Sequence, residues 1–224
     1  MFKIFRRVAG VLLVVASCAA AQDISTLKLR AAAGDASAQY NLADLYMSGR
    51  GVARDFAKAA VWLRKAAEQG YAPAQSALGV LYDSGNGVPR NYAQAAVWTR
   101  KAAEQGEATA QFNLAVMYTL GSGLPQDFAQ AATWFRKAAD QGNADAQHNL
   151  GEAYRLGRGV PQDFAEAYFW FDLAAAGKLD ALKTKTAMKM RDETASHLTA
   201  ADLSRVQERA RKWFADHTAN PPAQ

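Results

Sequence analysis

The apolar residues of this chain recur at the spacing of a helix surface, and the helices they predict come in pairs. The first helix of the first pair is predicted to span about residues 35–48. Its apolar residues follow one another at steps of three or four, which places them on one face. They are Ala38, Leu42, Leu45 and Tyr46. We expect this face to pack against the neighbouring helices.

A glycine-containing turn and a second helix complete the pair. Gly49 and Gly51 are predicted to end the first helix, because glycine adopts left-handed backbone angles without a side-chain clash. Asp55 then supplies an acceptor for the exposed amides at the start of the second helix. This second helix ends at Gly70 and carries the stripe Ala59, Trp62 and Ala66.

The pair of helices recurs with a period of 36 residues, and the rarest residue types show it most clearly. The tryptophans at this spacing are Trp62, Trp98, Trp134 and Trp170. The tyrosines near the end of each first helix are Tyr46, Tyr82, Tyr118 and Tyr154. The paired glycines are Gly49/Gly51, Gly85/Gly87, Gly121/Gly123 and Gly157/Gly159. Such a period indicates stacked units that bury their apolar faces only against one another, and we expect each tryptophan to fill the gap between two units.

The repeated pattern, A-x-A-Q-x-x-L-[AG]-x-x-Y-x-x-G-x-G-[VL]-x-x-[DN]-[FY]-x-x-A-x-x-W-x-x-x-A-A, closely resembles the Sel1-like repeat of the tetratricopeptide-like superfamily. The resemblance covers residues 35–177. It implies an all-α fold, a right-handed α-solenoid of four helix-turn-helix repeats with N- and C-terminal capping helices. The four repeats are predicted at residues 35–70, 71–106, 107–142 and 143–177.

Both ends of the stack are predicted to be closed by atypical helices. The predicted segments are an N-terminal capping helix at residues 22–34, C-terminal capping helices at 178–217 and a flexible tail at 218–224. In the C-terminal cap, a degenerate first helix is predicted to pack through Leu179, Leu182, Thr186 and Met190. Thr199 and Asp202 start another helix, whose stripe is Leu203, Val206, Ala210 and Trp213. This stripe is predicted to dock on Tyr168, Phe169, Trp170 and Phe171.

The first residues of the chain have the order of a secretory signal peptide, predicted at residues 1–21. Lys3, Arg6 and Arg7 precede an apolar run, and small residues follow it. Two cleavage schemes stay open. Cleavage after Ala21 would release a soluble chain, whereas a lipobox ending in Cys18 would remove residues 1–17 and leave a lipoprotein anchored through that cysteine. We therefore expect a periplasmic or otherwise exported protein that contacts membrane only through the signal peptide or the Cys18 lipid.

Composition argues against nucleic acid as a partner and against a catalytic site. The formal charge of +5 falls to +2 without Lys3, Arg6 and Arg7, because 23 basic residues then face 21 acidic ones, and no dense basic stripe remains. With three histidines and one cysteine, the chain carries none of the common catalytic or phosphate-binding motifs. Asp145, His148 and Glu152 could lie together on one helix, but no further histidine or cysteine is placed to complete a metal site. We predict a protein that is not an enzyme and has no cofactor.

The first helices carry a set of positions that do not repeat, and these are the predicted partner-binding residues. In order along the chain they are Tyr40, Asp44, Met47, Ser76, Val80, Asp83, Phe112, Val116, Thr119, His148, Glu152 and Arg155. The resemblance implies that first helices line a concave groove, which suits a peptide or helix of another protein. The repeated Gln39, Gln75, Gln111 and Gln147 are interpreted as structural hydrogen-bonding residues. We predict a non-catalytic adaptor in the bacterial envelope, with a binder or weak hydrolase of a cell-wall ligand as the alternative.

Overall fold

The computed structural model describes residues 23–219, and every regular element in that range is a helix. The predicted signal peptide and Cys18 lie outside the described residues, as do residues 220–224 of the predicted tail. The described residues form two compact units, one up to Ala102 (unit 1) and one from Ala103 onward (unit 2). The predicted all-helical repeat architecture is confirmed, with consecutive helices packed as helix-turn-helix pairs.

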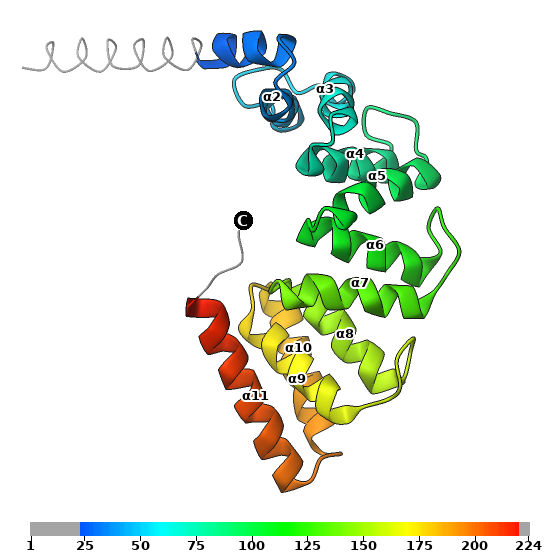
Figure 1. The fold of residues 1–224 in the computed structure, drawn as a ribbon, viewed down its shortest axis with the longest axis vertical. Coiled ribbons are helices and arrows are strands. Elements are labelled where there is room, and N and C mark those ends of the chain that lie inside the picture. Colours follow the sequence, from blue (N-terminus) through cyan, green and yellow to red (C-terminus); the bar gives the residue numbers. More distant parts are fainter. Residues whose placement is uncertain (1–22, 220–224) are drawn as a thin grey trace, which may run out of the picture. The chain divides into compact units, whose positions relative to one another are not determined.

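Unit 1 begins with a helix over residues 23–32, which is the predicted N-terminal cap (Figure 1). The helices that follow are α2 (Ala36–Ser48), α3 (Phe56–Glu68), α4 (Ala72–Ser84) and α5 (Tyr92–Glu104). Helix α3 packs against both α2 and α4. Ala31 of the cap is buried with Ala38 and Leu42 of α2, so the cap covers the apolar face that the first repeat would otherwise expose.

Unit 2 contains the remaining helices, drawn from green to red in Figure 1. They are α6 (Ala108–Leu120), α7 (Phe128–Asp140), α8 (Ala144–Leu156), α9 (Phe164–Ala176), α10 (Ala181–Ala195) and α11 (Ala200–Ala219). Helices α6 to α9 continue the pairwise packing, and both α10 and α11 pack against α9. Helix α11 continues two residues into the segment predicted as a tail.

The turn inside each repeat is held at both ends by backbone and capping hydrogen bonds. In the fourth repeat, Gly157 ends α8 in the left-handed conformation, with φ of 66°. Asp163 starts α9, and its carboxylate accepts hydrogen bonds from the amides of Ala165 and Glu166. The Asp163 amide donates to the carbonyl of Tyr154 at 3.0 Å, which closes the loop. The predicted helix stops and starts are therefore confirmed at these residues.

The second glycine of the pair has a further role that the turn pattern did not indicate. A β-carbon added at Gly159 would lie 2.0 Å from the carbonyl oxygen of Phe128, the first residue of α7. In unit 1, the equivalent distance from Gly87 to the Phe56 carbonyl oxygen is 2.2 Å. Each of these turns thus touches the start of the second helix one repeat earlier, and only glycine permits that approach.

The repeated glutamines connect each first helix to the helix before it, as predicted. Gln147 is 1% exposed, and its side-chain nitrogen donates to the carbonyl of Ala139 at 3.1 Å. Equivalent bonds join Gln39 to Ala31 at 3.0 Å in unit 1. A fixed hydrogen bond at every repeat satisfies a buried amide and sets the spacing of neighbouring helices.

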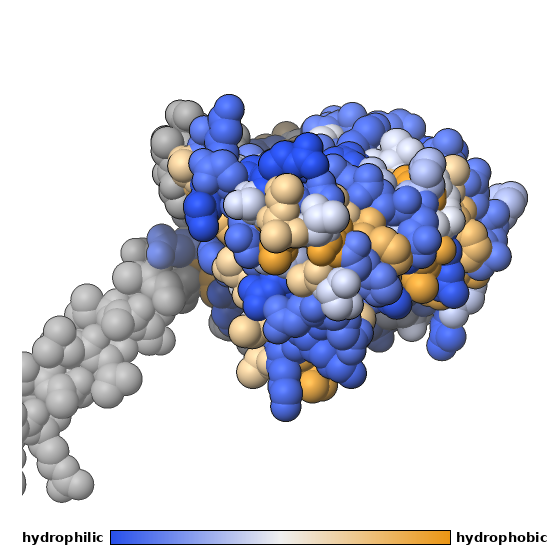
Figure 2. All heavy atoms as spheres, turned by 90° about the horizontal axis from the view of Figure 1, so that it is seen from below, coloured by the Kyte–Doolittle hydropathy of each residue, from blue (hydrophilic) through white to orange (hydrophobic). Residues whose placement is uncertain are grey.

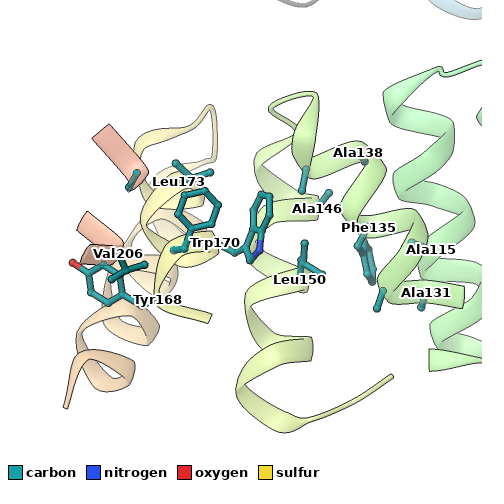
Figure 3. Close-up of a cluster of buried hydrophobic side chains, with 14 residues drawn as sticks. Ala115, Ala131, Phe135, Ala138, Ala146, Leu150, Tyr168, Trp170, Leu173 and Val206 are labelled. Atoms are coloured by element: carbon teal, nitrogen blue, oxygen red, sulfur yellow. The ribbon is translucent and has the colours of Figure 1, made fainter. Parts of the chain in front are cut away.

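The tryptophans fill gaps between helices, but not all to the same depth. Trp62 is half-buried and packs in clusters with residues of the N-terminal cap, α2 and α3. Lys65 covers its outer face, with the ammonium 4.4 Å from the ring centre. Trp170 is 1% exposed, because α11 closes the end of unit 2. Figure 3 shows its indole reaching from α9 towards α8.

The C-terminal cap confirms one predicted packing face and corrects another. Val206 and Ala210 of α11 are buried in one cluster with Tyr168, Phe169 and Trp170, and Figure 3 shows Val206 beside Tyr168. Phe171 is not part of that cluster and lies beside Gly151 of α8 instead. On α10, the buried residues are Ala187 and Thr194, and the predicted packing residue Leu182 is 75% exposed. Leu182 lies five residues before Ala187, about 140° around the helix, so the two residues are on different sides of α10. The predicted packing residue Thr186 is exposed too, whereas Leu179 and Met190 are half-buried.

Candidate functional site

Each first helix carries three predicted binding positions, and the first of the three lies partly inside the fold. Tyr40, Ser76, Phe112 and His148 are half-buried. The Phe112 ring packs against Phe135 of α7, with 5.8 Å between the ring centres. His148 packs against Phe171 of α9 at 5.5 Å. These side chains therefore have structural contacts besides any contact with a ligand.

The second and third predicted positions differ widely in exposure and pairing. Val80 is 50% exposed, and Asp83 is exposed as well. Met47 and Val116 are partly buried against the cores of their units. Asp44 pairs with Arg50, and Glu152 pairs with Arg155. The Thr119 hydroxyl donates to the carbonyl of Ala115 at 2.9 Å.

Unit 2 contains a half-enclosed pocket of about 230 Å³ between α6, α7 and α8, here called the α6–α8 pocket. Its lining residues are Thr119, Phe128, Ala131, Ala132, Phe135, Asn149, Glu152, Ala153, Leu156 and Arg158. Of the predicted residues, the pocket brings together Thr119 and Glu152. Phe128, Asn149, Leu156 and Arg158 were not predicted.

A comparison of the four copies could have revealed this pocket. The last residue of the first helix is Ser48 and Ser84 in the first two copies, but Leu120 and Leu156 in the last two. Leu156 is 40% exposed and Leu120 is 67% exposed. A change from a small polar residue to a large apolar one at an exposed position is informative, because folding does not require it.

The two charged residues that line the α6–α8 pocket, Glu152 and Arg158, differ in their ion pairing. The Arg155 guanidinium donates to both carboxylate oxygens of Glu152, at 3.2 and 2.8 Å, and this hydrogen bonding raises the pKa of Arg155 above its ordinary value. Arg158 is exposed and forms no ion pair with any described residue. The Asn149 side-chain nitrogen donates to the carbonyl of Asp145 at 2.7 Å.

His148 lies one turn before Glu152 on α8, next to the second helix of its repeat. Its Nδ1 atom is buried and has no hydrogen-bond partner within residues 23–219. Burial lowers the pKa of the imidazole below its ordinary value. Asp145 pairs with Lys183 of α10 at 2.7 Å. Nowhere in the described part of the chain do three or more histidine, cysteine or acidic residues form a group that could hold a metal ion.

A second pocket of about 240 Å³ lies where α11 meets α7 and α9. Both of its arginines are already paired with the protein's own Glu166. Arg209 pairs with Glu166 and lies 3.8 Å from the Phe169 ring centre. Arg136 also pairs with Glu166, at 3.7 Å. Burial raises the pKa of the Asp140 carboxyl at its edge. We interpret this pocket as part of the packing that holds α11.

Five segments of the chain match the Sel1 repeat, at residues 36–71, 72–107, 108–143, 144–178 and 196–215. The chain belongs to the Sel1 repeat family. The first four matches agree with the predicted repeats to within one residue at each boundary. The fifth falls in the predicted C-terminal cap, so α11 retains Sel1 repeat character that the sequence reading had not assigned to it.

Solved structures of Sel1 repeat proteins resemble this chain. A Sel1 repeat protein from Oxalobacter formigenes is 37% identical over 75% of this chain, with a TM-score of 0.67. The protein c5321, a protective antigen present in uropathogenic Escherichia coli strains and displaying an SLR fold, is 31% identical over 91% of this chain, with a TM-score of 0.57. The matches cover 49% and 52% of those two chains, so this Sel1 repeat chain spans about half their length. No match was found among the curated proteins.

Sel1 repeat proteins in general mediate contacts between proteins and are typically non-catalytic scaffolds. The surface of this member suits that role. On the face shown in Figure 2, apolar residues gather in patches surrounded by hydrophilic ones. Of the helices described here, none has the length and apolar character needed to cross a membrane.

Proposed function

We propose that this Sel1 repeat protein is a non-catalytic adaptor of the bacterial envelope that holds a segment of another protein against its first helices. The observation that carries the proposal is the α6–α8 pocket. It opens where the first helices carry residues that do not repeat, and it contains Thr119 and Glu152 from the predicted set. Residues that repeat, such as Gln147 and Leu150, are buried between helices.

The envelope location is part of the proposal and rests on the order of residues near the start of the chain. Basic residues, an apolar run and small residues follow one another as in a signal peptide. The two processing schemes, with cleavage after Ala21 or lipidation of Cys18, predict different masses. Fractionation of the cells followed by intact-mass measurement separates them. Recovery of the chain in the cytoplasm alone would contradict export.

The cell-wall alternative has less support from the residues of the site. A hydrolase of a glycan needs two carboxyl groups that face each other across the substrate. In the α6–α8 pocket, the one carboxylate is Glu152, and Arg155 neutralises it. We therefore prefer a protein partner.

Site-specific cross-linking in cells tests the adaptor proposal. A photoreactive amino acid placed at Val80 of unit 1 or Thr119 of unit 2 would lie on a first helix. Val97 and Thr133 are exposed positions on second helices of the same units and serve as matched controls. We expect one discrete cross-linked product from Val80, Thr119 or both, and none from the controls. Equal products at all four positions, or none, would contradict the proposal.

A further inference from the structure

The α6–α8 pocket has features that define the chemistry of its occupant, and the inference below rests on the proposed adaptor function. Its rim is apolar and uncovered, since Phe128 is 36% exposed and Leu156 is 40% exposed. Covering apolar surface is favourable, roughly in proportion to the area removed from water. A bulky apolar side chain inserted here would gain that stabilisation from both residues.

Leu156 of the rim is not needed for folding of the repeat. In unit 1, Ser48 and Ser84 occupy the position of Leu156. Their hydroxyls donate to carbonyls of their own helices, Ser48 to Asp44 at 2.8 Å and Ser84 to Val80 at 2.9 Å. Because the same turn forms with serine, the turn itself does not require the leucine.

The floor of the pocket gives it depth. Ala131 and Ala132 of α7 are each 3% exposed, and the ring of Phe135 lies beside them (Figure 3 shows Ala131 and Phe135). The short alanine side chains leave space between α6 and α8 above α7. A single side chain of the size of leucine or phenylalanine fits such a space better than a flat surface contact.

The polar groups of the pocket offer one acceptor and one cation. Asn149 uses its side-chain nitrogen within α8, and its oxygen accepts no hydrogen bond from the residues described here. An extended peptide has backbone N–H groups free to donate to that oxygen, whereas the N–H groups inside a helix are already bonded. Arg158 carries a charge that no residue within 23–219 pairs with, while the charge of Glu152 is neutralised by Arg155. A carboxylate is the group that complements Arg158.

From these contacts, we propose that the α6–α8 pocket binds an extended segment of a partner protein in which a bulky apolar side chain is followed by an acidic residue. The apolar side chain enters between Phe128 and Leu156. The segment's backbone donates to Asn149, and its carboxylate pairs with Arg158.

Defined peptides test this proposal. Three decapeptides of glycine and serine would carry Phe-Glu, Phe-Lys or Ser-Glu at their centre, and each would be titrated into the isotopically labelled protein at millimolar concentration. We expect the Phe-Glu peptide to shift the NMR signals of Asn149 and Leu156 and to bind at least fivefold more tightly than the other two. Equal binding of the three peptides, or shifts confined to other residues, would overturn the proposal.

Variants of the pocket make the test specific. Leu156→Ser restores the residue of the first two repeats, so it should fold and weaken Phe-Glu binding at least fivefold. Arg158→Glu should reverse the preference towards Phe-Lys. Arg50 is the equivalent residue in unit 1 and pairs with Asp44, so Arg50→Ser is the matched control for Arg158→Ser. If Arg158→Ser leaves Phe-Glu binding unchanged, the assignment of Arg158 is wrong.

Failure of this inference can be told apart from failure of the adaptor function. Cross-linking from Val80 of unit 1 together with no selective peptide binding in unit 2 would leave the adaptor function standing and reject the α6–α8 pocket as its site. Absence of cross-linking from both first-helix positions would reject the adaptor function itself.

Discussion

The Cα atom of Gly159 lies against the carbonyl group of Phe128, so closely that a β-carbon on Gly159 would be 2.0 Å from the oxygen. The two residues belong to successive repeats of unit 2 and are separated by 31 positions. This contact joins the turn of one Sel1 repeat to the second helix of the repeat before it.

Replacing Gly159 with alanine should therefore destabilise unit 2 more than replacing Gly157. Both glycines have positive φ, 66° at Gly157 and 75° at Gly159, so alanine is strained by about 1 kcal/mol at either position. Only Gly159→Ala also places a methyl group into backbone, which adds about 1–3 kcal/mol. Denaturant unfolding of the two variants measures the difference. Equal losses would show that the close contact relaxes without cost.

The buried tryptophan should contribute more to stability than its half-buried equivalents. Trp170 is 1% exposed and donates from its indole nitrogen to Glu166 at 3.2 Å. Trp170→Ala should lower the free energy of unfolding by about 3–5 kcal/mol. Trp134→Ala should cost less, because Lys137 covers one face of that ring and solvent reaches it. Urea unfolding compares the two, and a larger loss for Trp134→Ala would contradict this ranking.

Arg209 should hold α11 on unit 2. Its guanidinium pairs with Glu166 of α9 and lies over the ring of Phe169, and a partly desolvated cation over an aromatic ring contributes about 0.5–2 kcal/mol. Arg209→Ala should speed amide hydrogen exchange in α11 while leaving α6 and α7 protected. Arg211 on the same helix pairs with Glu208, and both side chains are more than 70% exposed, so Arg211→Ala is the control. Similar exchange in both variants would argue against a specific role for Arg209.

Acid should destabilise the protein through His148. Burial holds the pKa of His148 below the ordinary value of 6.5, so the folded state disfavours the protonated imidazole and the unfolded state does not. Stability is then complete above about pH 6.5 and falls as the pH drops towards the folded-state pKa.

The comparison of intact protein with His148→Gln at pH 8 and pH 5 isolates this effect, because His197 and His217 are present in both. On going from pH 8 to pH 5, the intact protein should lose more unfolding free energy than the variant does. An unchanged difference would mean that the imidazole is hydrated in the folded protein.

The sequence predicted the repeat fold well because its signals were local and occurred four times. Trp62 and Tyr46 set the register, and Gly49 and Asp55 marked where helices end and begin. The packing of α10 could not be predicted in the same way. Its apolar residue Leu182 is exposed while Ala187 is buried on the helix that packs against α9. Hydrophobicity alone does not indicate which side of such a helix the neighbouring helix covers.

The candidate site was predicted only in part, for a related reason. Helical spacing placed Thr119 and Glu152 on the same type of surface, and both line the α6–α8 pocket. Phe128 and Arg158 come from a second helix and a turn, so no pattern within the first helices included them. The depth of the pocket depends on Ala131 and Ala132. The first-repeat equivalent of Ala131 is Ala59, which the sequence pattern indicates only as a packing residue.

The contact between Gly159 and Phe128 also limits how a protein of this kind can change in length during evolution. A residue inserted into the turn would move the glycine away from the earlier helix and break the contact. Duplication of a complete segment of 36 residues would reproduce the turn and its target together. Genes for such proteins should therefore gain and lose length in whole copies of the repeat. Selection can then change the number of repeats without changing the sequence of any single repeat.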